Sequence, residues 1–245
     1  MRIVVAEKYR HLESRLRDVA KLSDAGETIY QARNKVSVIR LDEIVLNIKA
    51  FKIPNFVNQL AYSTIRKSKA ERSFFYAHKV IEAGFRTPAP VCFVEKHSGL
   101  LLKESYYVSA HEEFDGMLRE LNYGTFDEHT ALIKAFGLYT AQLHDAGILH
   151  IDYSPGNILY KKIDGQYSFY LVDLNRMKFA VDITADMACR NFRRLWGSRE
   201  MLSYLVEIYA NARGFDKAYC VERMLHYRSK FEKKGSWKNF LKKEA

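Results

Sequence analysis

The sequence predicts an α+β fold of two lobes, in which a five-stranded antiparallel sheet with one helix precedes a mainly helical lobe. Short apolar runs separated by polar turns indicate the strands. These runs lie at 29–32, 36–41, 44–51, 90–95 and 100–109, and a helical pattern at 65–83 ends at Gly84. The first lobe is expected to span residues 1–110 and the second 111–245, and together they form one domain.

The second lobe begins with an amphipathic helix and continues into a hairpin. Apolar residues recur at near-helical spacing from Asp127 to Ala146, and Gly147 is placed to end the helix. Ile158-Leu159-Tyr160 begins a strand, Asp164-Gly165 is a hairpin turn, and 167–172 returns as a second strand. Asp173 therefore stands at the end of a strand.

Between this helix and this hairpin lies the most specific motif of the chain. His150, Asp152 and Asn157 have the spacing His-x-Asp-x-x-x-x-Asn, and Asp173 follows Asn157 by sixteen residues. This is the spacing of the catalytic loop and metal-binding Asp of protein kinases. Phosphoryl transfer needs a carboxylate that accepts the proton of the attacking hydroxyl, and two oxygen ligands for the magnesium that neutralises the phosphates. The motif therefore predicts a protein-kinase-like fold that uses ATP and Mg²⁺.

Kinases also need a lysine on the third strand and a glutamate on the following helix. Lys49 and Lys52 are the candidate lysines, and the apolar run before Lys49 favours it as the interior one. Glu71 and Glu82 are the acidic residues of the helix, and Glu71 is the better placed for the pairing. The alternatives are a solvated edge lysine and an exposed glutamate paired with a neighbouring lysine. The backbone of 109–112 is expected to contact adenine.

Four stretches carry a resemblance to a known family. They are Arg66-Lys67-Ser68-Lys69-Ala70-Glu71-Arg72-Ser73-Phe74, Gly84-Phe85-Arg86-Thr87-Pro88-Ala89-Pro90, His150-x-Asp152-x-Ser154-Pro155-x-Asn157 and Asp173-Leu174-Asn175-Arg176. From about Gly26 to beyond Trp196, the chain resembles the bacterial lipopolysaccharide kinases, which include heptose kinases and 3-deoxy-manno-octulosonic acid (Kdo) kinases. The resemblance implies that Lys49 orients the α- and β-phosphates, that Asp152 is the base, and that Asn157 and Asp173 bind magnesium.

The chain departs from the protein-kinase pattern in three ways. It has no Gly-x-Gly-x-x-Gly, so the turn Arg33-Asn34-Lys35 would cover the phosphates, with side-chain charge in place of backbone amides. Ser73 occupies a position where related sequences carry Glu, which weakens the assignment of Glu71. Asn175 replaces the Gly of Asp-Phe-Gly, which indicates a fixed metal loop rather than a switching one.

The segment after Asp173 bears on the acceptor. Seventy-two residues follow it, without the Ala-Pro-Glu motif that protein kinases use in holding peptides. A small-molecule or glycan acceptor is therefore favoured. Arg190, Arg193 and Arg194, near Trp196, could bind a phosphate or carboxylate on that acceptor, or could form a solvated helix face.

The formal net charge of +10 implies an anionic partner. The end of the chain, 228–245, holds seven basic residues interleaved with aromatics, which suits an anionic membrane surface. The basic segment 8–22 is expected instead to pack on the protein. Three cysteines without a CxxC pair indicate reduced thiols. Together with the resemblance to the lipopolysaccharide kinases, which implies a lipid A-linked sugar as acceptor, these observations favour a cytoplasmic enzyme bound peripherally to the inner membrane.

Rival interpretations remain open. The chain could be a small kinase for proteins or metabolites, or an ATP-binding pseudokinase scaffold. Nucleic-acid binding would rest on charge alone, without a zinc-finger or RNA-recognition signature. Metal-dependent hydrolysis lacks support, because His111-Glu112-Glu113 has no second His four residues after the first.

Overall fold

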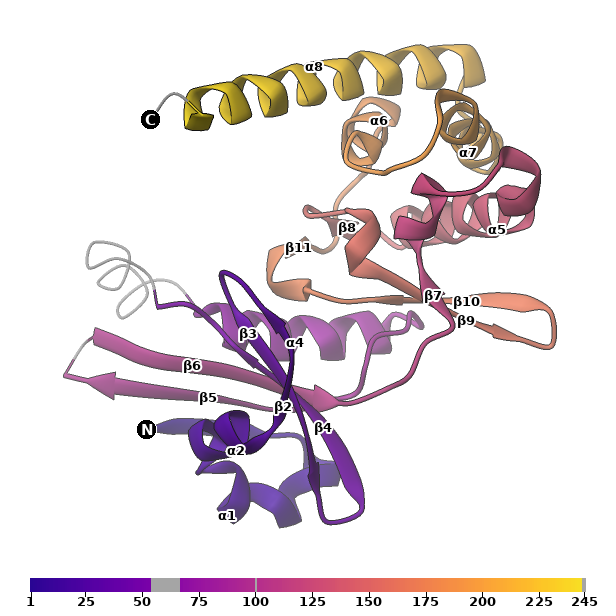
Figure 1. The fold of residues 1–245 in the computed structure, drawn as a ribbon. Coiled ribbons are helices and arrows are strands. Elements are labelled where there is room, and N and C mark those ends of the chain that lie inside the picture. Colours follow the sequence, from indigo (N-terminus) through magenta and orange to yellow (C-terminus); the bar gives the residue numbers. More distant parts are fainter. Residues whose placement is uncertain (54–66, 100, 244–245) are drawn as a thin grey trace. The chain divides into compact units, whose positions relative to one another are not determined.

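The computed structural model describes residues 1–53, 67–99 and 101–243, with side chains up to residue 233. The chain divides into two compact units. The first contains Met1–Glu113 together with Asp173–Asn175, and the second contains Phe114–Val172 and Arg176–Ala245. The elements of both are labelled in Figure 1. The expected boundary between 110 and 111 stays a prediction.

The first unit is built on a six-stranded antiparallel sheet with the order β1-β5-β6-β4-β3-β2. Its strands are β1 (Arg2–Val5), β2 (Glu27–Gln31), β3 (Lys35–Leu41), β4 (Ile44–Ala50), β5 (Pro90–Ser98) and β6 (Leu101–Ala110). Five of them were predicted. The sixth, β1, pairs with β5 at the edge and is only four residues long, too short for an alternating pattern to reveal.

The β3–β4 hairpin fixes where the interior lysine lies. Its two strands pair without a break from Lys35 opposite Ala50 to Leu41 opposite Ile44. Asp42 makes the tight turn with a φ of 55°, in the left-handed region that Asp tolerates better than most residues. On the other side β4 pairs with β6, and this register places Lys49 between Val36 and Tyr107.

Helices cover both faces of this sheet (Figure 1). The N-terminal helices η1 (Glu7–Leu12), α1 (Glu13–Leu16) and α2 (Val19–Ala25) bury Leu16 and Val19 against Leu46 and Ile48 of β4. The basic segment 8–22 therefore packs on the protein, as expected. The opposite face carries α4 (Lys69–Glu82), whose Phe74 packs on Phe93 of β5.

The start of α4 differs from the prediction. Residues 65 and 66 lie outside the described residues, as does Leu100 at the start of the predicted strand 100–109, and 67–68 are not helical. Ser68 caps the helix, because its Oγ accepts a hydrogen bond of 3.0 Å from the backbone N–H of Glu71. This cap makes Lys69 the first helical residue and puts Glu71 in the first turn.

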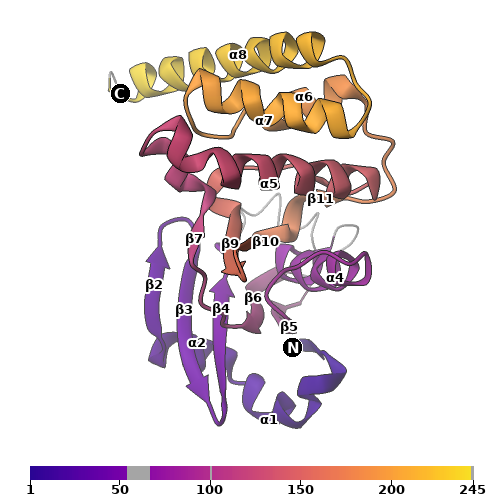
Figure 2. The ribbon, with the colours of Figure 1, turned by 90° about the vertical axis from the view of Figure 1, so that its right-hand side faces the viewer.

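The second unit is mainly helical. Its long helices are α5 (Phe126–Asp145), α6 (Ala185–Phe192), α7 (Arg199–Ala212) and α8 (Lys217–Lys243). Figure 2 shows α7 between α5 and α8. The predicted helix 127–146 and hairpin are confirmed within two residues, with β9 (Ile158–Ile163) pairing β10 (Gln166–Leu171).

Short elements frame the predicted catalytic loop of the second unit. They are β7 (Gly116–Met117), η2 (Leu118–Asn122), β8 (Leu149–His150), η3 (Pro155–Asn157) and β11 (Met177–Lys178); η4 (Leu174–Arg176) links the units in sequence. The pair β8–β11 places His150 opposite Met177. Across the described part of the chain, no helix is long and apolar enough to cross a membrane.

Candidate active site

Hydrogen bonds of His150 hold the predicted catalytic loop in place. Its ring is fully buried, and Nδ1 accepts a hydrogen bond of 3.1 Å from the backbone N–H of Asp152. The ring is therefore protonated on Nε2, which donates to the carbonyl of Val172 at 3.1 Å. The amide of Asn191 donates to the carbonyl of His150 at 3.0 Å. The loop is thus tied to the strand that ends just before Asp173.

Asn157 is oriented by the same loop. Its side-chain Nδ2 donates to the carbonyl of Asp152 at 2.9 Å, and its own carbonyl accepts from the N–H of Val172 at 3.0 Å. Because Nδ2 is the donor end of the amide, Oδ1 is left as an acceptor. An amide oxygen fixed in this way suits a hard cation such as Mg²⁺.

Tyr153 fastens the loop to α5. Its side chain is fully buried and stacks on Phe136, with the ring centroids 5.7 Å apart. Its hydroxyl lies 2.9 Å from the Oγ1 of Thr140, which in turn donates to the carbonyl of Phe136. The loop is therefore anchored in the core of the second unit.

The carboxylate of Asp152 is occupied by two arginines. Its Oδ1 pairs with Nη1 of Arg194, and its Oδ2 lies 3.9 Å from Nη1 of Arg176. The side chain is 28% exposed, so it can be reached by a ligand. Of the three arginines expected at an acceptor site, Arg194 alone reaches Asp152 among the described residues. Arg193 donates instead to the carbonyl of Arg190.

The first unit brings together Lys49 and Asp173. The Nζ of Lys49 lies 2.7 Å from Oδ1 of Asp173, and the lysine is 18% exposed. Asn175 also donates to this oxygen. Asp173 has a φ of 57°, a conformation that costs free energy for a residue other than glycine and is often found at functional sites. The prediction that Lys49 is the interior lysine is consistent with this contact; Lys52 follows the strand and lines a surface pocket.

Glu71 does not pair with Lys49, and this part of the prediction is wrong for the structure. Its carboxylate accepts two hydrogen bonds, of 3.0 and 3.1 Å, from the guanidinium of Arg2. Arg2 also pairs with Glu95 on the neighbouring strand at 3.5 Å. Because β1 forms the edge of the sheet beside β5, Arg2 turns Glu71 toward that edge and away from β4.

Lys69 is a further candidate site residue, which the sequence pattern did not single out. Its Nζ lies 5.9 Å from the ring centre of Phe51, and the Nζ of Lys49 lies 5.3 Å from the same ring. Burial lowers the pKa of Lys69, and so does the charge of Arg33, whereas Asp173 opposes the shift. Arg33 belongs to the turn expected to cover the phosphates. The signal available in the sequence was a lysine directly after the helix-capping Ser68.

These residues form an excess of positive charge around one carboxylate. Lys49, Lys69 and Arg33 carry three positive charges, and Asp173 supplies the negative charge that acts on both lysines. Two cations lie near one aromatic ring, that of Phe51, where each is attracted to the ring but repelled by the other. An arrangement of this kind is favourable for a polyanion such as a triphosphate.

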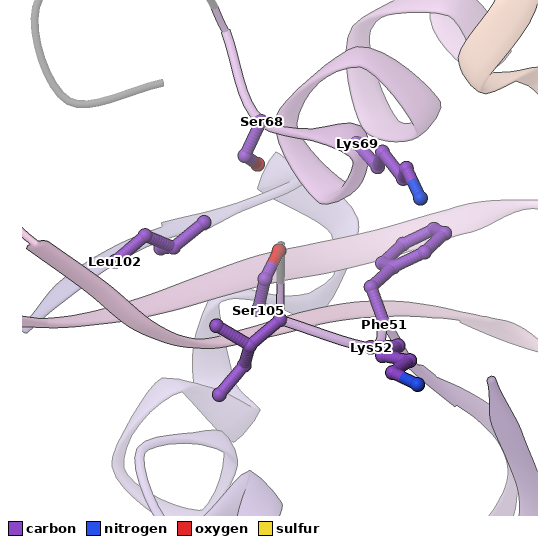
Figure 3. A pocket seen from close by; sticks show the side chains of 7 residues that line it. Phe51, Lys52, Ser68, Lys69, Leu102 and Ser105 are labelled. Atoms are coloured by element: carbon purple, nitrogen blue, oxygen red, sulfur yellow. The ribbon is translucent and has the colours of Figure 1, made fainter. Parts of the chain in front are cut away.

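A pocket beside Lys69 is not large enough for a nucleotide. It is lined mainly by apolar atoms of Phe51, Ile53 and Leu102, with Lys69 above the Phe51 ring at one end (Figure 3). Its volume is about 280 Å³ even with open solvent included, whereas ligand pockets measure roughly 300–1,000 Å³. We therefore assign no ligand to it.

Part of the backbone expected to contact adenine is used by the sheet. The backbone N–H of Ala110 donates to Ala89 at 2.8 Å, and that of His111 donates to Val45 at 2.8 Å. At least these two N–H groups of 109–112 therefore have partners within the first unit.

Comparison with known proteins identifies the family. A family model described as lipopolysaccharide kinase (Kdo/WaaP) matches residues 54–219, about two thirds of the chain. The chain belongs to the lipopolysaccharide kinase (Kdo/WaaP) family. The predicted resemblance is confirmed, and it makes the chain a member of a family of kinases. No curated protein matches.

A solved structure shares the fold of this chain. It is described as WaaP in complex with acyl carrier protein, and it matches with a TM-score of 0.63 over 94% of this chain and 99% of WaaP. The identity is 17%, so the match shows the fold and not the acceptor. The predicted kinase-like α+β fold is confirmed.

Proposed function

We propose that this protein transfers the γ-phosphoryl group of ATP to a hydroxyl of a lipopolysaccharide inner-core sugar, Kdo or heptose linked to lipid A. The observation that carries the proposal is the loop in which His150 fixes the backbone of Asp152 while Asn157 is held to the same residue. In a chain of the lipopolysaccharide kinase family, this loop has the residues that phosphoryl transfer requires.

In the proposed reaction Asp152 is the general base. The acceptor O–H bond breaks and its proton passes to the Asp152 carboxylate. A bond forms between that oxygen and the γ-phosphorus, and the bond from the γ-phosphorus to the oxygen bridging to the β-phosphate breaks, which releases ADP. Asn157 and Asp173 would hold Mg²⁺, which supplies charge neutralisation for the phosphates. The oriented amide oxygen of Asn157 and the carboxylate of Asp173 fit this cation, which needs few protein ligands.

Lys49 and Lys69 are proposed as the phosphate-binding cations, with Arg33 in support. In protein kinases, the strand lysine pairs with a glutamate of the following helix. Here Glu71 is held by Arg2 instead, and Lys69 would supply a second cation for the phosphates. Before ATP binds, Asp173 would pair with Lys49. This division of roles also explains how phosphates are bound without a glycine-rich loop.

We also propose that a basic surface brings the enzyme to an anionic partner. The favoured partner is the membrane that carries lipid A, on the cytoplasmic face of the inner membrane. The solved WaaP structure contains acyl carrier protein, so a carrier protein is the second candidate for a partner of this chain.

The experiment that tests the function supplies γ-labelled ATP and Mg²⁺ with separate acceptors: Kdo-lipid A, heptosylated core and a generic protein. Label on one glycolipid supports the proposal and identifies the acceptor. Label on protein alone would favour the protein-kinase interpretation. Binding of ATP without transfer to any acceptor, and without release of inorganic phosphate, would favour the pseudokinase.

A further inference from the structure

We propose that Arg194 is the residue that selects an anionic acceptor: it pairs with Asp152 until a carboxylate or phosphate on the acceptor draws its guanidinium away. The proposal rests on the proposed function for the role of Asp152. It concerns the second unit alone, and it names the chemistry of the substrate, a hydroxyl on a sugar that also carries an anionic group.

The position of Arg194 is fixed by packing. The residue follows α6, and its guanidinium lies over the ring of Phe231 on α8, 5.6 Å from the ring centre. Arg228, on the same helix, donates to the carbonyl of Leu195, the next residue in the chain. The arginine is 30% exposed and its partner carboxylate 28%, so a ligand can reach the pair although both side chains are partly buried.

This ion pair conflicts with the role of Asp152 as a base. A guanidinium that donates to a carboxylate stabilises its charged form and occupies the lone pair that must accept the proton. Arg176, 3.9 Å from the other carboxylate oxygen, acts in the same direction. A productive acceptor must therefore displace Arg194 from Asp152, at the cost of this partly exposed ion pair.

An anionic acceptor offsets this cost, whereas a neutral acceptor does not. A carboxylate or phosphate on the acceptor can accept two-pronged hydrogen bonds from the guanidinium, in place of the single contact between Arg194 Nη1 and Asp152 Oδ1. The hydroxyl beside that anion then meets a carboxylate with a free lone pair. One residue thus links recognition of the acceptor to activation of the base.

Arg193 of the predicted cluster and Arg223 on α8 have other partners. Arg193 donates to the Arg190 carbonyl, and Arg223 pairs with Asp186, whose carboxylate also accepts from Tyr227. The pair Arg223–Asp186 is of the same chemical kind and lies in the same unit, but it does not involve Asp152. It provides a matched control.

The kinetic test compares Kdo with its carboxyl methyl ester, in wild type, Arg194→Gln and Arg223→Gln. In wild type and in Arg223→Gln, kcat/KM should be about tenfold or more higher for Kdo than for its methyl ester, as expected for one charged hydrogen bond. Arg194→Gln should lose this preference while using the ester at least as well as wild type, because Asp152 is released. A purely structural role would lower activity with both acceptors. A retained preference in Arg194→Gln would overturn the proposal.

A binding test separates this inference from the proposed function. In protein labelled with ¹⁵N at arginine, the side-chain Nε–H signal missing from Arg194→Gln identifies Arg194. Kdo should shift that signal and the methyl ester should not, whether or not phosphate is transferred. A signal that ignores Kdo would overturn the inference, and absent transfer with a shifted signal would count against the proposed function alone. Glucose 6-phosphate against glucose repeats the comparison for phosphate as the anion.

Discussion

At the residue scale, two lysines of the first unit lie near the ring of Phe51: Lys49 on strand β4 and Lys69 at the start of helix α4. Lys49 could be predicted as the interior lysine because the residues before it in the same strand are largely apolar, which keeps its side chain close to the sheet. Its partner was not predictable. The glutamate expected there faces Arg2, and that contact depends on a four-residue strand far away in the sequence. Local patterns do not report such long-range pairs.

Lys49 should be needed for ATP use and Lys52 should not. Lys49→Met removes the cation that contacts Asp173, and kcat/KM for ATP should fall by about tenfold or more, as for the loss of a charged hydrogen bond. Lys52→Met serves as the control because Lys52 lies beyond the strand and lines the small surface pocket. A larger loss in Lys52→Met than in Lys49→Met would reverse the assignment.

Lys69 should contribute to nucleotide affinity. Lys69→Gln should raise the KM for ATP. This increase should be smaller at high salt, because a cation near phosphates acts partly through Coulomb attraction, which salt screens. Lys67→Gln is the control, since Lys67 is 62% exposed and its nearest acid is Glu71, 3.9 Å away. Equal effects of both substitutions would show that only total charge matters.

At the scale of elements, α5 and α7 meet around a buried histidine. The Nδ1 of His144 lies 2.9 Å from the hydroxyl of Tyr209, and the ring is almost fully buried. Burial, together with the charge of Arg213, lowers the pKa of His144 to about 3. The helix itself was predicted correctly from its apolar spacing, but which of its residues would be buried against another helix was not.

This histidine should make the fold sensitive to acid. The unfolded chain binds a proton at His144 near pH 6.5 and the folded chain does not until about pH 3, so stability falls as the pH drops below 6.5. At pH 5 the loss is about 2 kcal/mol. Urea unfolding at pH 7 and pH 5 should show this loss in wild type, and His144→Gln should lack it. The same loss in the variant would exclude His144 as its source.

The elements themselves were largely predictable, because strand and helix periods are local. The predicted catalytic loop is the clearest case, because Asp152 and Asn157 lie in one short segment, which the structure fixes through His150. The edge strand β1 and the exact start of α4 were not predictable. The first depends on pairing with β5, and the second depends on the cap at Ser68.

At the scale of the whole molecule, charge gives a testable account of the partner. Lys234, Lys238, Lys242 and Lys243 near the end of the chain account for a large part of the formal excess of +10. Each basic residue near an anionic surface is worth about 1 kcal/mol. Changing the four to Gln should therefore reduce flotation with phosphatidylglycerol vesicles by about tenfold or more.

The control for this prediction keeps the number of lysines removed but changes their place. Four lysines of the first unit, Lys8, Lys21, Lys96 and Lys103, should be replaceable with little loss of vesicle binding. An equal loss for both sets would show that total charge, rather than this helix, recruits the protein. Unchanged binding after the tail substitutions would refute the membrane role of this segment.

The central claim, that Asp152 is the base of a phosphotransferase, is tested most directly by Asp152→Asn. The substitution keeps the shape of the side chain but removes the proton acceptor. With ATP binding measured in parallel, the variant should bind ATP like wild type and transfer label to the glycolipid acceptor at a rate lower by at least about a hundredfold. Transfer at the wild-type rate would contradict the account.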